Sequence, residues 1–144
     1  MSAEENKAIQ RRIYEAYSQG DLAALDELIA PDNISHAEPI PGQEPGLEGL
    51  KKVLTMFRSA FPDITMTPDV MIAEGDKVAT HVVTQGTNTG EFMGNPPTGK
   101  EIKMESFDIN RFADGKLVEH WGHVDVAKMM QQLGVAPPMG ESEG

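Results

Sequence analysis

The sequence predicts an α+β fold in which three N-terminal helices pack on a strongly curved antiparallel sheet of about four strands, followed by a short C-terminal helix. Apolar residues recur at three- and four-residue spacing before residue 62 and alternate with polar residues after residue 64. A chain of 144 residues suits one domain with a substantial core. We therefore expect residues 1–144 to form a single domain, with residues 137–144 as a frayed tail.

The first half of the chain has the pattern of three helices. Residues 3–19 and residues 22–29 each carry an apolar stripe at helical spacing, and residues 47–61 carry a third. Residues 31–46 contain four prolines, which remove backbone donors that a regular element needs. We expect this segment to be a loop, and it contains His36.

The second half has the pattern of an antiparallel meander. Strands are expected at residues 65–73, 77–89 and 101–112, and in the run after Asp114-Gly115. Asp-Gly between two alternating runs is a strong hairpin signal, so these last two strands should form a hairpin. Residues 126–133 are expected to close the fold as a helix.

Composition limits the classes of partner. Acidic residues number 23 against 12 basic ones, and the formal charge of -11 repels nucleic acid and anionic membrane surfaces. The chain has no cysteine, which excludes disulfides and thiolate metal sites. It has no apolar run long enough to span a bilayer, and its N-terminus is acidic where a signal peptide would be basic. We expect a cytoplasmic protein that binds neither nucleic acid nor membrane.

In the strand after the Asp-Gly turn, alternation places an aromatic residue and several ionisable residues on one face. Successive side chains of a strand point to opposite faces, so four residues of this strand share one face while His120 points to the other. That set consists of Glu119, Trp121, His123 and Asp125. One aromatic ring and three ionisable groups on one face are the composition expected of a strand that lines a pocket.

Asp125 is the first candidate for chemistry. A carboxylate beside Trp121 and near His123 can be desolvated, which raises its pKa toward working pH and suits it to proton transfer. The alternative is that Asp125 caps the helix expected at residues 126–133, since Asp is among the best N-cap residues. Both can hold, because a cap can lie at the mouth of a site.

Other side chains are candidates for binding a ligand. Trp121 can stack on a flat ligand, and Tyr14 and Tyr17 can offer a phenol to a developing oxyanion. Met104 belongs to a set of methionines suited to an adaptable apolar lining, and His81 lies on a strand that could approach the site. Core packing is the alternative for the tyrosines and methionines.

No cofactor or metal site is expected. The only short histidine spacing is His120-x-x-His123, and two such side chains diverge on a strand. The glycine-rich residues 90–99 lack the ending of a phosphate-binding loop, and no serine nucleophile elbow is present. Any chemistry should be proton transfer without a cofactor.

Several motifs together resemble one family. They are Phe61-Pro62-Asp63, Gly86-Thr87-Asn88-Thr89-Gly90 with its continuation to Lys100, the hairpin Arg111 to Trp121, Asp125, and Gln132-Leu133-Gly134. In these residues the chain resembles the SnoaL-like polyketide cyclases (ester cyclases) of the nuclear transport factor 2-like superfamily, over about residues 5–136. The resemblance implies an α+β cone. It also implies a cofactor-free intramolecular aldol cyclisation of an anthraquinone-type ester, with Asp125 matching the family's acid/base aspartate.

The chain departs from that family at one position of the pocket and at Asn88, which stands where many relatives have a histidine. The cyclases carry a histidine on the strand before the hairpin, where this chain offers Asp108 or Asn110, so His36 and His123 are expected to compensate. The expected function is a general acid/base enzyme, whether aldol cyclase, lyase or isomerase, that acts on a carbon acid in an apolar pocket. The alternative is a non-catalytic protein that binds a small apolar or aromatic molecule.

A homodimer or higher homo-oligomer is also expected. Curved sheets of this kind often pair back to back, and the strands of the hairpin can supply an apolar outer face. The side chains that would do so are Phe107, Ile109 and Val118.

Overall fold

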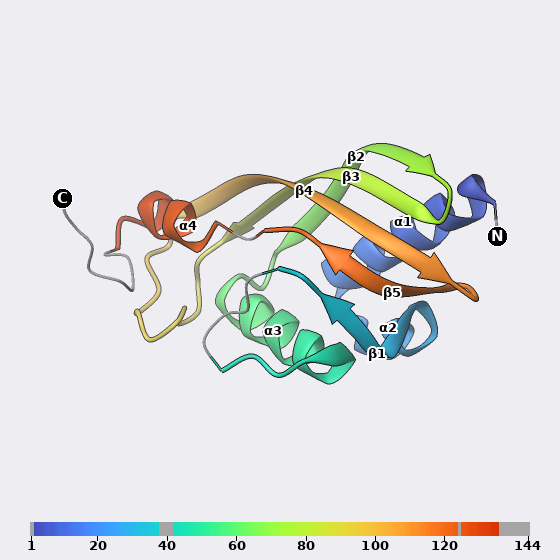
Figure 1. Ribbon diagram of the computed structural model, residues 1–144. Coiled ribbons are helices and arrows are strands. Elements are labelled where there is room, and N and C mark those ends of the chain that lie inside the picture. The colour runs from blue at the N-terminus through green and yellow to red at the C-terminus, as the bar shows by residue number, and fades with distance from the viewer. Residues whose placement is uncertain (1, 38–41, 124, 136–144) are drawn as a thin grey trace.

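The computed structural model describes residues 2–37, 42–123 and 125–135, so the prediction of a frayed tail at residues 137–144 lies outside the described residues. The predicted α+β class is confirmed, with the elements in nearly the predicted order (Figure 1). They are α1 (Ala3–Gln19), α2 (Leu22–Leu28), β1 (Ile29–Ser35), α3 (Gly46–Ala60), β2 (Thr65–Glu74), β3 (Lys77–Thr87), β4 (Glu101–Ala113), β5 (Lys116–Trp121) and α4 (Val126–Leu133).

The strands form one curved sheet in the order β1-β5-β4-β3-β2. Neighbouring strands are antiparallel except β1 and β5, which are parallel. Helix α1 packs on β2 and β3, while α3 packs on β1, so both helices lie on the concave side of the sheet (Figure 1). The convex side forms an outer face.

Strand β1 is where the structure differs most from the expected elements. Residues 31–35 were expected in a loop, but they pair with β5 at the edge of the sheet. Pro31 is tolerated there because an edge strand leaves one side without ladder bonds, and the register shifts between Ile29 and Ile34. The sheet therefore has five strands and one parallel pair.

Local signals in the sequence set the helix ends. Ser2 and Glu5 form a capping box at the start of α1, with the Ser2 backbone N–H donating to Glu5 Oε1 over 2.8 Å. Gly20 ends the helix at φ +71°, a conformation that glycine adopts without strain. Asp21 then caps α2 by accepting a hydrogen bond from the Ala24 N–H.

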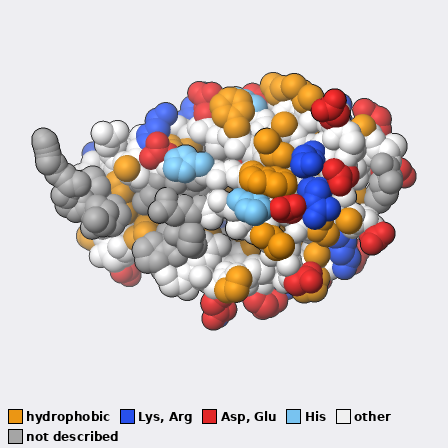
Figure 2. Space-filling view, in the orientation of Figure 1, with side chains coloured by type: hydrophobic (Ala, Val, Ile, Leu, Met, Phe, Trp, Pro, Cys, Tyr) orange, Lys and Arg blue, Asp and Glu red, His pale blue; other side chains and the backbone are white. Residues whose placement is uncertain are grey.

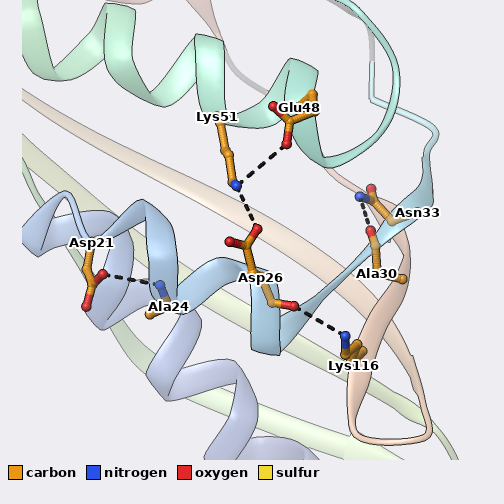
Figure 3. A network of polar contacts seen from close by, with 8 residues as sticks. All are labelled: Asp21, Ala24, Asp26, Ala30, Asn33, Glu48, Lys51 and Lys116. Atoms are coloured by element: carbon orange, nitrogen blue, oxygen red, sulfur yellow. Dashed lines mark hydrogen bonds and ion pairs between the residues drawn. The ribbon is translucent and has the colours of Figure 1, made fainter.

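The corner between α2 and β1 is tied to two other elements by polar contacts (Figure 3). Lys51 of α3 donates to the Asp26 carboxylate over 2.6 Å and lies 3.6 Å from Glu48. Lys116 of β5 donates to the Asp26 carbonyl over 3.2 Å. These contacts hold α2, α3 and β5 together beside the space enclosed under the sheet.

The predicted hairpin between β4 and β5 is present, with its turn at Asp114 and Gly115. Both turn residues have positive φ, +52° and +79°, as a two-residue hairpin turn of this kind requires. Beyond the turn Phe112 pairs with Leu117, but Arg111 pairs with Glu119.

One residue of β5, Val118, is therefore extra, which is a β-bulge. A regular ladder counted from the Ala113–Lys116 pair would have set Glu119 opposite Asn110 and Trp121 opposite Asp108. The bulge shifts the register by one residue, and such a shift moves every later side chain to the other face. His120 now pairs with Asn110 and points to the concave side.

Candidate functional site

A cavity of about 760 Å³ lies under the concave side of the sheet. Side chains from α1, α3, β1, the sheet and α4 line it, and its apolar part includes Leu50, Val53, Phe57, Ile64, Val82 and Met129. Six of the residues predicted for the site contribute to the lining: Tyr14, Tyr17, Met104, Asn110, His123 and Asp125. Among the other ionisable residues that line it are Asp108 and His120.

Tyr14 and Asp108 form a pair inside the cavity. The Tyr14 hydroxyl, on a side chain that is buried against the sheet, donates to Asp108 Oδ2 over 2.5 Å. Burial, with the nearby negative charge of Asp108, raises the pKa of Tyr14 well above its usual value, and burial also raises the pKa of Tyr17. Both phenols therefore keep their protons at neutral pH and can act as hydrogen-bond donors.

His120 belongs to the same inner part of the cavity. Its Nδ1 lies 2.7 Å from Asn110 Oδ1. Burial lowers the pKa of His120 despite the opposing effect of Asp108, so the imidazole is neutral at pH 7. A Cβ built on Gly122 would lie 2.8 Å from His120 Nε2 and 2.6 Å from Asp108 Oδ1. Glycine at this position thus leaves the space that the two side chains share.

His123 and Asp125 occupy the rim of the cavity and are exposed. Asp125 Oδ1 accepts the Lys128 N–H over 3.0 Å, so the carboxylate caps α4 while it lines the cavity. The environment expected for Asp125 was wrong, because its side chain is exposed rather than desolvated beside Trp121. Asp125 therefore both caps α4 and lies at the rim of the cavity.

Trp121 and His36 lie on the outer face, and the prediction that they reach the pocket was wrong. Their rings stack with centroids 5.0 Å apart. His36 Nε2 lies 2.6 Å from Glu119 Oε2, and Arg111 Nε donates to Glu119 Oε1 over 2.8 Å. The bulge at Val118 is the physical reason, since it turns Glu119 and Trp121 away from the concave side.

His81 is also on the outer face, so the prediction that it approaches the site was wrong. Its two ring nitrogens lie 2.5 Å from Asp69 Oδ1 and 2.9 Å from Glu105 Oε1. The hydrogen bond with Asp69, followed by that with Glu105, raises the pKa of His81. The His81 ring also packs on the Phe107 ring, with the two ring centroids 4.9 Å apart.

The outer face carries apolar side chains as well as charges. The exposed large ones there, in the described part of the chain, include Val70, Ile72, Phe107 and Ile109, with Phe107 73% exposed. Figure 2 shows hydrophobic side chains, histidines and charges of both signs intermixed on the face turned to the viewer. The homodimer stays a prediction, and the exposed apolar side chains of this face are compatible with it.

The residues missed by sequence reasoning are His120 and its support, Gln10. Alternation along β4 already placed Asp108 and Asn110 on one face, and this signal was available. His120 was assigned to the face away from the pocket because the bulge leaves no clear mark in the sequence. The burial of Gln10 on α1, with 0% exposure, depends on tertiary packing.

The structure also bears on metal sites and membrane-spanning helices. Within residues 2–37, 42–123 and 125–135, no group of three or more histidine and carboxylate side chains is placed to hold a metal ion. No helix in the same part of the chain is long and apolar enough to cross a membrane.

Comparison with known proteins gives the family. Aklanonic acid methyl ester cyclase DauD of Streptomyces sp. (strain C5) is 28% identical over 137 residues, covering 91% of this chain and 83% of that protein. DnrD of Streptomyces peucetius, also an aklanonic acid methyl ester cyclase, is 26% identical, covering 91% and 92%. The crystal structure of wild-type IdmH from Streptomyces antibioticus is 40% identical, covers 90% of this chain and 99% of that chain, and superposes with a TM-score of 0.79. The SnoaL-like polyketide cyclase profile matches residues 7–133, and the chain therefore belongs to that family.

Proposed function

We propose that this protein is a cofactor-independent general acid/base enzyme of the cyclase type, which acts on a carbon acid with Asp125 as the base. The cavity of about 760 Å³ is the observation that carries the proposal. It combines an apolar lining with a carboxylate at the rim and proton-bearing phenols inside. DauD and DnrD, which are similar over 91% of this chain, are cyclases of a methyl ester.

The proposed reaction is an intramolecular aldol addition. Asp125 removes a proton from a carbon next to a carbonyl group, and the enolate carbon forms a bond to a second carbonyl carbon of the same molecule. The oxygen of that second carbonyl takes up a proton, so substrate and product contain the same atoms. Tyr17 donates a hydrogen bond to the developing oxyanion, and His123 at the rim exchanges protons with Asp125 and solvent.

Asp125→Asn is the sharpest variant to test the proposal. Asn is as good an N-cap as Asp, so α4 keeps its first turn while the base is lost. Aklanonic acid methyl ester serves as the probe, and two readouts apply: formation of a cyclised isomer by chromatography, and deuterium uptake at the acidic carbon in D₂O by mass spectrometry. We expect both rates to fall by about 10²- to 10⁴-fold.

Asp21→Asn is the matched control. Asp21 caps α2 through the same kind of bond, accepted from Ala24 N–H over 3.2 Å, and is not among the residues that line the cavity. This control should keep wild-type rates. Full activity in Asp125→Asn would contradict the role of Asp125.

Binding without turnover is the alternative outcome. If the wild-type protein binds the probe but accelerates neither deuterium uptake nor cyclisation, the enzyme proposal fails for this carbon acid. A non-catalytic binding protein would then be the better description of the chain.

A further inference from the structure

A chain of buried polar side chains runs from β3 through α1 to His120. Gln10 Nε2 donates to Thr80 Oγ1 over 3.0 Å, and Asn110 Nδ2 donates to Gln10 Oε1 over 2.8 Å. Asn110 Oδ1 then lies 2.7 Å from His120 Nδ1. The three side chains before His120 are at most 3% exposed, so water does not compete for these bonds.

The donor-to-acceptor direction of these hydrogen bonds decides which nitrogen of His120 carries the proton. Asn110 uses its NH₂ group for Gln10, so it presents its amide oxygen to the imidazole. An amide oxygen can only accept a hydrogen bond, and Nδ1 must therefore carry the proton. In a neutral imidazole the other nitrogen, Nε2, then has a lone pair and accepts.

A second acceptor faces the same space as His120 Nε2. Asp108 Oδ2 is occupied by the Tyr14 hydroxyl, while Oδ1 lies beside Gly122. A Cβ on Gly122 would lie 2.6 Å from Asp108 Oδ1 and 2.8 Å from His120 Nε2, so the two acceptor atoms lie close to each other, on side chains that both line the cavity. One acceptor is a carboxylate, so the pair favours a hydrogen-bond donor and disfavours an anion.

We propose that His120 Nε2 and Asp108 Oδ1 form a subsite for an acidic hydroxyl group, a phenol or an enol, of the molecule bound in the cavity. Gln10 and Asn110 are positioning residues that hold His120 in the tautomer with the proton on Nδ1. The subsite rests on the proposed function only in so far as it uses the same cavity. It adds a requirement on the substrate: a hydroxyl donor at the inner end, with the carbon acid near Asp125.

The tautomer of His120 can be read without any ligand or activity. Long-range ¹H–¹⁵N correlation of the imidazole in wild-type protein at pH 7.5 should show a protonated Nδ1 and an unprotonated Nε2. Asn110→Leu removes the acceptor and should shift His120 toward the Nε2-protonated form. Gln10→Glu is the matched control, because a Glu side chain presents an acceptor oxygen to Asn110 in either protonation state, and it should keep the wild-type spectrum.

Binding of 2-naphthol, 2-methoxynaphthalene and 2-naphthoate tests the subsite itself. We expect the wild-type protein to bind 2-naphthol about tenfold more tightly than its methyl ether and to bind the carboxylate more weakly still. The preference for the hydroxyl should vanish in Asn110→Leu and persist in Gln10→Glu. Asp125→Asn should keep it as well, so a failure of the catalytic proposal leaves this result intact.

Three results would overturn the subsite. They are an Nε2-protonated His120 in the wild-type protein, equal affinity for the hydroxyl and the methyl ether, and no binding of 2-naphthol. The first needs no variant, so it decides the matter even if Asn110→Leu fails to fold.

Discussion

Replacing Gly122 by alanine should disturb the inner part of the cavity through a single methyl group. The added Cβ would lie 2.6 Å from Asp108 Oδ1 and 2.8 Å from both His120 Nε2 and Cε1, closer than non-bonded atoms tolerate. The φ of Gly122 is outside the left-handed region, so alanine accepts the backbone and the destabilising part of the effect is steric. One or both side chains must move.

The size of the effect follows from the cost of overpacking. Insertion of a methyl group into a filled site typically costs about 1 to 3 kcal/mol. For a domain of this length each kcal/mol lowers the melting temperature by about 3 to 5 °C, so we expect a fall of about 3 to 15 °C in Gly122→Ala. Thermal unfolding by circular dichroism measures it, and the ¹⁵N resonances of His120 report the local displacement.

Gly75→Ala separates this steric effect from the general cost of replacing a glycine. A Cβ at Gly75 would meet nothing within 4 Å, but its φ of +61° strains an alanine by about 1 to 2 kcal/mol. Both variants should therefore melt earlier, and only Gly122→Ala should shift the His120 resonances. Unchanged resonances in Gly122→Ala would refute the close approach of His120 and Asp108 to position 122.

Two more predictions concern stability. The raised pKa of His81 means that its bonds to Asp69 and Glu105 stabilise the fold fully below the unfolded pKa of about 6.5, and that this contribution is lost as pH rises through the folded pKa. His81→Gln should therefore lower the melting temperature more at pH 5.5 than at pH 9, and an equal loss at both would argue against the ion pairs. Ser2→Ala removes one half of the capping box of α1 and should cost about 1 kcal/mol, or about 3 to 5 °C in thermal unfolding, whereas an unchanged melting temperature would mean that the cap contributes nothing.

The hairpin illustrates how far local reasoning reaches. Asp114 and Gly115 were identified because their positive φ is a property of those two residue types in a tight turn. The face of β5 that lines the cavity could not be obtained in this way. It depends on the bulge at Val118, and a bulge reflects how two strands pair over their whole length.

The histidines also show which features local sequence predicts and which depend on strand pairing. Alternation placed His120 opposite Trp121, and this relation holds, but the face that meets the cavity was reversed. His36 directly follows β1, which pairs with β5 across most of the chain length, and no local pattern indicates such a parallel contact. Its stacking on Trp121 is a consequence of that pairing.

The sequence by itself determined the α+β class, the positions of the helices and of β2 to β5, and the membership of the SnoaL-like polyketide cyclase family, and it offered the cap formed by Asp125 as one alternative. Only the tertiary structure decided which residues meet in the cavity, among them His120 with Asp108, and which lie on the outer face. The physical reason is how far apart in the sequence the interacting residues lie. Turns, caps and periodicity arise from residues close in sequence, whereas register, edge pairing and the burial of Gln10 arise from contacts between distant segments.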